Sequence, residues 1–351
     1  MRFNRVFVLA MVSVLFLLFL ANCTAPPTPT PVVVTRVATV LVKETVIQTV
    51  VVPTEKVVTA TPLPPTPTPK PATIRMYFVP STEVDKIIAS GKKIADMLKK
   101  STGYDFEVAV PTSYAAVIEA LCAGKADVAW LATFAYVLAS EKCGVEAKLA
   151  TVRFGLSTYN AEFITLADKE RQAKGLKPIK TLEDLNGAKF AFTDPVSASG
   201  YLFPKYMLEQ AKVKLGQEIF AGGHPQVVLA VYKGEVDAGA TFFSPLRPDG
   251  TIGDARRNVI ETYPDVEQKV KILRLSDPIP NDTVSFRKDL PQDVKDKIVS
   301  ALLAMAKTSE GVKVLGELYN ITGLAPASDA DYDIVRGMAK TLGIDLGKLV
   351  K

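Results

Sequence analysis

Histidine and cysteine are scarce in this chain of 351 residues, which contains one histidine and three cysteines. At their spacings, these residues cannot supply the four ligands of a usual structural zinc site. The patterns HExxH, CxxC and GxxxxGK followed by Ser or Thr are also missing from the sequence. These absences argue against a zinc protease, a thioredoxin-like oxidoreductase and a P-loop nucleotidase, and we expect no cofactor and no metal.

An excess of charge of one sign is nearly absent from most of the chain. Lysine and arginine together number 42 and aspartate and glutamate 37, which gives a formal net charge of +5. Four of these five charges come from Arg2, Arg5 and residues 24–72, so about +1 remains for the rest of the chain. A nucleic-acid-binding protein needs a clustered basic surface, and we therefore expect no nucleic-acid partner.

The N-terminus has the pattern of a secretory signal peptide. Arg2 and Arg5 precede a run over residues 6–20 that is apolar except for Ser13 and is short for a membrane-spanning helix. We predict a signal peptide over residues 1–22 and place the rest of the chain outside the cytoplasmic membrane.

Cys23 follows this run in the sequence Leu20-Ala21-Asn22-Cys23, which resembles the lipobox of bacterial lipoproteins. In that motif the cysteine is lipid-modified and becomes the first residue of the mature chain. Asn22 departs from the pattern, which prefers a small residue there, so an uncleaved signal anchor with an unmodified thiol is the alternative. Both interpretations tether the protein to the cell membrane.

Residues 23–72 form a predicted tether. Residues 24–72 contain 11 of the 24 prolines and 12 threonines. This composition cannot pack a core and favours an extended, polyproline-like chain. A Val- and Thr-rich tract over residues 32–58 could pair as a strand, but turn signals and a partner strand are missing, which favours a spacer.

Strand-like and helix-like patterns alternate after the tether. A strand pattern at residues 74–79 precedes a helix for which Thr82 is the expected N-cap, and the same order then recurs. A second series begins near residue 161 and includes predicted helices at residues 201–212 and 225–232. The alternation indicates an α/β protein with two lobes, each a mainly parallel sheet flanked by helices, and a ligand cleft between them.

Cys122 and Cys143 remain once Cys23 is assigned to lipid. Both fall near the ends of consecutive predicted helices, and an oxidising compartment would allow them to pair. The sequence does not give the distance between them, so a disulfide and two separate thiols both stay open.

The segment 194–204, between a predicted strand and a helix, carries two candidate ligand-binding serines. Ser197 and Ser199 would place hydroxyl groups at a helix start, where backbone N–H groups are unpaired and the helix dipole is positive. Pro204 fits the first turn of a helix that begins near Gly200. Such a site suits an oxyanion, although both serines could also be ordinary capping residues without a ligand.

His224 stands in the sequence Gly222-Gly223-His224-Pro225, directly before a second predicted helix. A lone histidine is commonly a capping or packing residue, but a glycine pair before a helix start favours a ligand-binding role. Ser199, His224 and Asp282 could also form the triad of a secreted serine hydrolase. The G-x-S-x-G pattern of a nucleophile elbow is missing around Ser199, which argues against that alternative.

Several stretches of the chain, in the same order, resemble one family. From about residue 73 to 308 the chain resembles the periplasmic substrate-binding proteins of phosphate, phosphite and phosphonate ABC transporters. The stretches that carry this resemblance are residues 113–121, 126–130 and 194–202, His224, and residues 230–231, 236–237 and 278–282.

The resemblance implies a two-lobed periplasmic-binding-protein fold. Lobe 1 would comprise residues 73–160 and lobe 2 residues 161–280. Residues 281–351 would return to lobe 1 and add C-terminal helices. The residues implied to hold the oxyanion are Tyr114 and Tyr159 from lobe 1, and Ser197, Ala198, Ser199, His224 and Asp282 from lobe 2.

Three of these implied positions bear on the choice of ligand. The family commonly has threonine where this chain has Ala198, so a hydroxyl is lost but the backbone N–H remains. An ionised Asp282 only accepts hydrogen bonds, which would favour a protonated phosphate or phosphonate over sulfate. Binders of aminoalkylphosphonates have a glutamate in the loop that here spans residues 241–245, so we expect phosphite, phosphate or a small phosphonate. Phe242 and Phe243 in that loop could line the ligand or belong to the core.

We therefore expect a monomeric, lipid-anchored receptor that is not an enzyme. It would deliver a phosphorus oxyanion to the transmembrane permease subunits of an ABC importer. Closure of the lobes around the ligand would produce the form that the permease recognises. The same fold could instead feed a sensor kinase, and the sequence does not separate the two.

Overall fold

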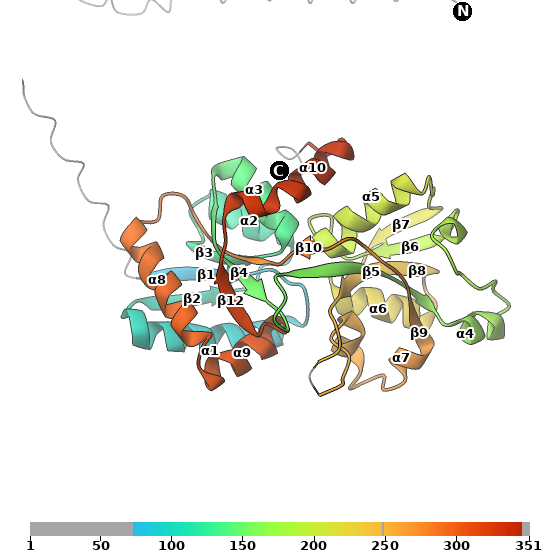
Figure 1. The fold of residues 1–351 in the computed structure, drawn as a ribbon, viewed down its shortest axis with the longest axis horizontal. Helices are drawn as coiled ribbons and strands as arrows, with labels where there is room; N and C mark the ends of the chain where they lie inside the picture. Colours follow the sequence, from blue (N-terminus) through green and yellow to red (C-terminus); the bar gives the residue numbers. More distant parts are fainter. Residues whose placement is uncertain (1–72, 248, 346–351) are drawn as a thin grey trace, which may run out of the picture. The chain divides into compact units, whose positions relative to one another are not determined.

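The computed structural model describes residues 73–247 and 249–345, drawn as a ribbon in Figure 1. The predicted signal peptide, Cys23, the tether and its Val- and Thr-rich tract therefore lie outside the described residues. Within the described ranges, no helix is long and apolar enough to cross a membrane.

The first lobe contains a six-stranded sheet. Its strands are β1 (Thr73–Phe78), β2 (Asp105–Ala109), β3 (Val128–Leu131), β4 (Glu146–Val152), β11 (Thr283–Phe286) and β12 (Gly323–Pro326). In space they follow the order β12-β4-β11-β3-β1-β2. The strand β11 lies between β3 and β4, so a segment from late in the chain completes the middle of this sheet.

Helices cover both faces of the first sheet. They are α1 (Val84–Thr102), α2 (Tyr114–Cys122), α3 (Thr133–Cys143), α8 (Gln292–Met305), α9 (Ser309–Tyr319) and α10 (Asp333–Thr341). Successive side chains of a strand point to opposite faces. Val128 and Trp130 of β3 therefore pack with residues of α1, α8 and α9, while Ala129 and Leu131 pack with residues of α2, α3 and α10.

The second lobe contains another six-stranded sheet. Its strands are β5 (Thr158–Leu166), β6 (Lys189–Phe192), β7 (Gln217–Phe220), β8 (Ala238–Phe243), β9 (Val270–Leu275) and β10 (Ile279–Pro280). The order is β10-β5-β8-β6-β7, and β9 also pairs with β5. The helices of this lobe are α4 (Asp168–Ala173), α5 (Phe203–Gln210), α6 (His224–Lys233) and α7 (Val266–Lys269). Leu208 of α5 and Val227 of α6 belong to two different clusters of buried side chains.

Both sheets are mixed, whereas the sequence pattern indicated mainly parallel ones. Parallel pairing holds for β1 with β2 and β3, and for β6 with β7 and β8. The strands β5, β10 and β11 are antiparallel to their neighbours. Parallel neighbours are joined by a crossover connection, as β1 and β2 are by α1. The strands β5, β10 and β11 instead adjoin the crossings between the lobes and pair with strands from elsewhere in the chain.

The chain passes between the two sheets twice, from β4 to β5 and from β10 to β11 (Figure 1). Asn281 joins the two crossing segments. Its backbone N–H donates to the carbonyl of Ser157 at 3.0 Å, and its Nδ2 donates to the carbonyl of Leu156 at 2.9 Å. The two crossings therefore lie side by side between the lobes.

Cys122 and Cys143 form a disulfide, and their Cα atoms lie 5.5 Å apart. The bond joins the C-terminal ends of α2 and α3, two helices that pack on the same face of the first sheet. The structure thus decides an alternative that the sequence left open, because the distance between the cysteines depends on helix packing.

Thr82 is not the N-cap of α1, which corrects the expectation from the sequence. Glu83 occupies the N-cap position, and its side chain makes no capping hydrogen bond. The helix is stabilised instead by its buried face, which includes Ile87 and Ile94.

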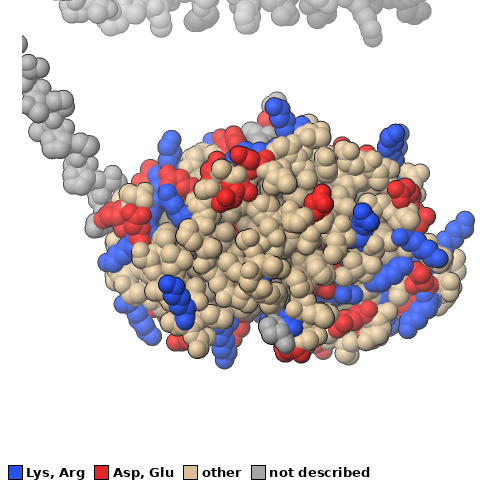
Figure 2. Space-filling model, viewed as in Figure 1, with Lys and Arg blue, Asp and Glu red and all other residues tan. Residues whose placement is uncertain are grey.

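Charged side chains of both signs are interspersed over the face drawn in Figure 2. This distribution agrees with the near-balance of charge in the corresponding part of the sequence. The face drawn therefore presents no broad area of positive charge to a polyanion.

Candidate functional site

A cavity of about 200 Å³ lies between the lobes and is lined by residues from both. Six of the seven residues implied to bind an oxyanion line it, namely Tyr114, Tyr159, Ser197, Ser199, His224 and Asp282. Ala198 does not line the cavity, because its side chain is buried in a hydrophobic cluster. Its backbone remains part of the turn that carries the two serines.

The serines lie in a tight turn that precedes α5. Residues Ala198–Leu202 form one turn of π-helix with Ser197 as its N-cap, and the Ser197 Oγ accepts a hydrogen bond from the Gly200 N–H at 3.0 Å. A Cβ atom on Gly200 would lie 2.3 Å from Thr193, so only glycine allows this close approach. Ser197 therefore has the expected capping role, and Ser199 is left facing the cavity.

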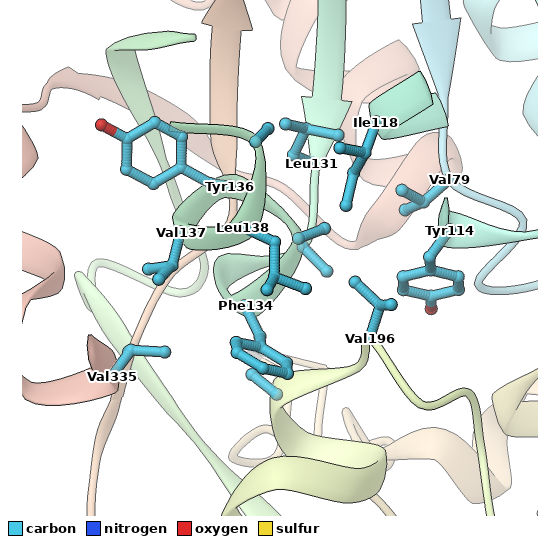
Figure 3. Close-up of a cluster of buried hydrophobic side chains, with 14 of the residues drawn as sticks. Val79, Tyr114, Ile118, Leu131, Phe134, Tyr136, Val137, Leu138, Val196 and Val335 are labelled. Atoms are coloured by element: carbon cyan, nitrogen blue, oxygen red, sulfur yellow. The ribbon is translucent and has the colours of Figure 1, made fainter. Parts of the chain in front are cut away.

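Packing between the lobes fixes the position of this turn. Val196 and Ala198 belong to the same buried cluster as Tyr114 and Phe134 of the first lobe. Figure 3 shows Val196 beside Tyr114 and Phe134. Burial of apolar surface across the lobes stabilises this arrangement and holds the serines near Tyr114.

His224 is the first residue of α6 and is 5% exposed. Its Nδ1 lies 2.6 Å from Thr241 Oγ1 and 3.3 Å from Thr193 Oγ1. Burial, reinforced by the charge of Arg153, lowers the pKa of His224 to about 3. The imidazole is therefore neutral at physiological pH, and when Thr241 donates to Nδ1, Nε2 carries the hydrogen and can act as a donor.

Two tyrosines add buried hydroxyl groups. Tyr114 comes from the first lobe, whereas Tyr159 lies on β5 of the second sheet, which corrects its expected place in lobe 1. Tyr114 begins α2 and is 1% exposed, and Tyr159 of β5 is 8% exposed. Burial is the largest cause that raises the pKa of both phenols above the usual range. Both therefore keep their protons and can donate hydrogen bonds to an anion.

Asp282 is paired with Arg153, a residue that the sequence analysis did not single out. Arg153 Nη2 donates to Asp282 Oδ2 at 2.6 Å, and Arg153 Nη1 donates to Asn281 Oδ1 at 3.2 Å. Arg153 follows β4 at the first crossing and lines the cavity. A basic residue at the end of a strand next to an expected crossing is the signal that could have identified it.

This pairing changes the argument about sulfate. The expected selectivity assumed an Asp282 carboxylate with no cation beside it. Because Arg153 balances that charge, the cost of placing sulfate near Asp282 is smaller than for an isolated carboxylate.

The described residues do not form a serine-hydrolase triad. The His224 Nδ1 contacts two threonines rather than a carboxylate, and Asp282 contacts Arg153. No hydrogen bond joins Ser199 to His224 within the described part of the chain. A triad needs both of these contacts to activate the serine, so this geometry does not support nucleophilic catalysis.

Phe242 lines the cavity and packs edge-on against His224, with ring centroids 4.9 Å apart. Phe243, its neighbour on β8, does not line the cavity. The alternation of side chains along a strand separates the two residues, and Phe242 is the one that faces the site.

Comparison with known proteins places the chain in a family. Residues 76–332 match the family described as ABC transporter, phosphonate, periplasmic substrate-binding protein. The chain belongs to this family. Phosphonate-binding periplasmic proteins of ABC transporters thus share its sequence pattern over most of the part that the structure describes.

Two curated relatives are similar over most of their own length. The phosphate-import protein PhnD of Mycolicibacterium smegmatis is 30% identical over 295 residues, which cover 78% of this chain and 87% of the relative. The phosphonates-binding periplasmic protein of Escherichia coli is 27% identical over 254 residues, which cover 69% of this chain and 68% of the relative.

Solved structures show the same two-lobed fold. The PhnD1 protein of Prochlorococcus marinus in complex with methylphosphonate matches with a TM-score of 0.66 and 17% identity, covering 78% of this chain and 99% of that chain. A binding-protein component of a phosphonate ABC transporter from Pseudomonas aeruginosa matches with a TM-score of 0.65 and 22% identity, covering 76% of this chain and 85% of that chain.

Proposed function

We propose that the cavity between the lobes binds a phosphorus oxyanion, namely phosphate, phosphite or a small phosphonate, and that the protein presents this ligand to the permease subunits of an ABC importer. The observation that supports this most directly is the convergence of neutral donors on one buried cavity. Ser199, His224, Tyr114 and Tyr159 all line it. Neutral donors can surround an anion without any change in their own protonation.

The ligand would bind at the start of α6 and at the turn before α5. Backbone N–H groups at such positions lack partners within the helix, and the helix dipole favours negative charge there. Arg153 adds a full positive charge at the same cavity, and Asp282 accepts hydrogen bonds beside it. Asp282 would therefore accept from a protonated ligand oxygen.

The substituent on phosphorus would be small or absent, and it would carry no positive charge. Phe242 forms an apolar part of the wall, and no carboxylate occupies residues 241–245. A carboxylate there would be needed to bind a positively charged aminoalkyl group in the manner that the family resemblance implies. The names of two relatives mention phosphate and methylphosphonate, which agree with such ligands.

We also propose that lipid on Cys23 and the tether at residues 23–72 hold the receptor at the outer side of the cytoplasmic membrane as a monomer. Residues 1–22 would be the signal peptide. The expected divisions at residues 160 and 280 would fall near the two crossings, with the remainder of the chain returning to lobe 1. The first division lies inside β5, which begins at Thr158 and belongs to the second sheet. A sensor kinase as the partner in place of a permease is compatible with the same ligand site.

The test is a calorimetric titration of the full chain in detergent with phosphate, phosphite, methylphosphonate, 2-aminoethylphosphonate and sulfate, at one pH and salt concentration. We expect one-to-one binding of a phosphorus oxyanion without turnover and weaker binding of sulfate. Ser199→Ala should weaken binding by roughly 1 to 3 kcal/mol because a buried hydrogen bond to the anion is lost.

Ser90→Ala is the matched control, since Ser90 is a buried serine of α1 that does not line the cavity. It should leave the affinity unchanged. Equal affinities for wild type and Ser199→Ala would contradict the proposed site, and no binding of any phosphorus ligand would contradict the proposed function.

A further inference from the structure

The cavity continues from the oxyanion site toward a part lined by Arg257, Asn258, Ile260 and Glu261 of the second lobe. Its volume of about 200 Å³ exceeds the space for one tetrahedral oxyanion, since a water molecule in the liquid takes about 30 Å³. The additional space can therefore receive a substituent on the phosphorus atom, and the residues around it would select that substituent.

A continuous path of contacts connects the two parts of the cavity. Arg153 bonds to Asp282 at one end, and its Nε donates to the carbonyl of Tyr319 at 3.1 Å. The next residue is Asn320, whose Oδ1 accepts a hydrogen bond from Arg257. Arg153 and Arg257 therefore contact two consecutive residues of the cavity wall, Tyr319 and Asn320.

Two arginines of the second lobe converge on this single amide oxygen. Asn320 Oδ1 also accepts from Arg247 Nη2 at 3.1 Å. Both guanidinium groups are half-buried, and neither makes an ion pair within the described residues. Burial is the largest cause that lowers the pKa of Arg257, and repulsion by the charge of Arg247 lowers it further.

Each of the other charged residues near Arg257 either has an ion-pair partner or is exposed to solvent. Lys86 pairs with Glu83 at 3.2 Å, and Glu317 pairs with Lys93 at 2.8 Å. Glu261 and Asp249 attract Arg257 only from beyond ion-pair distance, and both are exposed, so water screens them. Asp249 is also engaged by Thr251, through its backbone N–H at 2.9 Å and its Oγ1 at 2.6 Å.

We propose that Arg257, supported by Arg247, forms a second anion subsite that takes a carboxylate on the ligand's substituent, so that the receptor prefers phosphonocarboxylates over phosphonates with an uncharged tail. This inference rests on the proposed function, because the phosphonate group itself must occupy the oxyanion site. A carboxylate bound by Arg257 would accept charge-assisted hydrogen bonds from it and offset the repulsion between Arg257 and Arg247. Arginine suits this role because its planar donor pattern matches a carboxylate.

The experiment compares phosphonoacetate with methylphosphonate, two ligands that differ by one carboxylate, in calorimetric titrations of the full chain. Wild type should bind phosphonoacetate about tenfold or more tightly than methylphosphonate, as one charge-assisted hydrogen bond predicts. Arg257→Met should remove this preference and leave the affinity for methylphosphonate within about threefold of wild type. Higher salt should reduce the preference.

Two further variants separate this subsite from other roles of Arg257. Asn320→Gly removes the amide that both arginines contact and suits the left-handed backbone of that residue, whose φ is 58°. If Arg257 acts only by linking the lobes, Asn320→Gly will abolish the preference as Arg257→Met does, and that result would overturn the proposal. We expect Asn320→Gly to change both affinities by the same factor and to retain the preference.

Lys86→Met is the control for loss of a positive charge in the same cavity, since Lys86 already has a carboxylate partner. It should not change the preference. Binding of methylphosphonate with no gain for phosphonoacetate would overturn the subsite and leave the proposed function intact. No binding of either ligand or of phosphate would overturn both. Melting temperatures of all variants, measured in parallel, identify a variant that fails to fold. If Arg257→Met fails to fold, Arg257→Lys replaces it, and we expect a smaller loss of the preference for phosphonoacetate.

Discussion

Arg153 and Asp282 form an ion pair, with Nη2 to Oδ2 at 2.6 Å, that joins the two segments in which the chain crosses between the lobes. Both side chains are largely buried, with 10% and 23% of their surfaces exposed. The pair lies at the cavity, so the same two residues link the crossings and set the charge that a ligand meets.

Replacing Asp282 with asparagine should reduce the selection of protonated oxyanions over sulfate. The substitution removes a negative charge and leaves Arg153 without its partner, so sulfate should gain affinity relative to phosphate. We expect the difference between the two binding free energies to shrink by roughly 1 to 3 kcal/mol. Parallel titrations of wild type and Asp282→Asn with both anions measure this change.

The double variant Arg153→Met with Asp282→Asn is the control for this prediction. It removes both charges, so the relative gain of sulfate should be smaller than in Asp282→Asn alone. An unchanged ratio of phosphate to sulfate affinity in Asp282→Asn would show that the carboxylate does not contribute to selection.

His224 should make the folded protein less stable in acid. Its pKa is lowered to about 3 in the folded state, mainly by burial, from an ordinary value of about 6.5. The contribution of the neutral His224 imidazole to stability is therefore fully present above about pH 6.5. It is lost as the pH falls from there through about 3, because the unfolded chain binds the proton first. The loss relative to His224→Gln should be roughly 1.4 kcal/mol per pH unit within this window.

Urea unfolding of wild type and His224→Gln at several pH values between 4 and 8 measures this effect. The difference in unfolding free energy between the two proteins should change below about pH 6.5 and stay constant above it. A constant difference over the whole range would mean that the imidazole is not protected from protonation.

Glu162 should have the opposite effect on stability. It lies on β5 directly opposite Thr241 and is fully buried, and neither carboxyl oxygen has a hydrogen-bond partner among the described residues. Burial is the largest cause that raises its pKa well above the ordinary value, and the charge of Asp254 adds to it. Its contribution is therefore fully present below about pH 4.3, the ordinary glutamate value, and is lost as the pH rises through the raised pKa.

Glu162→Gln cannot ionise, so this loss should disappear in the variant. Wild type should become less stable relative to Glu162→Gln as the pH rises from about 5 to 9. Thermal unfolding across this range provides the measurement. Glu209→Gln, which changes an exposed glutamate of α5, should leave the pH dependence as in wild type. Parallel curves for wild type and Glu162→Gln would show that Glu162 is already ionised.

The disulfide should stabilise the first lobe without affecting the ligand. Cys122 and Cys143 are 21 positions apart, and a loop of this size predicts a stabilisation of about 3 kcal/mol through the unfolded state. Replacing both with serine should lower the unfolding free energy by about that amount. The ligand affinity should stay the same, since the bond is at the C-terminal end of α2 and Tyr114 is at the other end. A large change in affinity would indicate that the bond also positions α2 in the site.

Much of the fold and site could be predicted from local patterns. The order of strands and helices follows from hydrophobic periodicity, and the turn before α5 follows from Ser197, Gly200 and Pro204, whose roles are local. The N-cap of α1 was predicted wrongly, because a helix with a well-buried face needs no capping side chain. The antiparallel strands were missed because pairing direction depends on partners far away in the chain.

The sequence by itself determined which residue types stand at helix starts and that donors suited to an oxyanion are present. Only the tertiary structure decided that Arg153 meets Asp282, that Cys122 meets Cys143, and that two arginines share the oxygen of Asn320. The physical reason is that capping and periodicity act over a few residues, whereas ion pairs and disulfides depend on the packing that brings distant segments together.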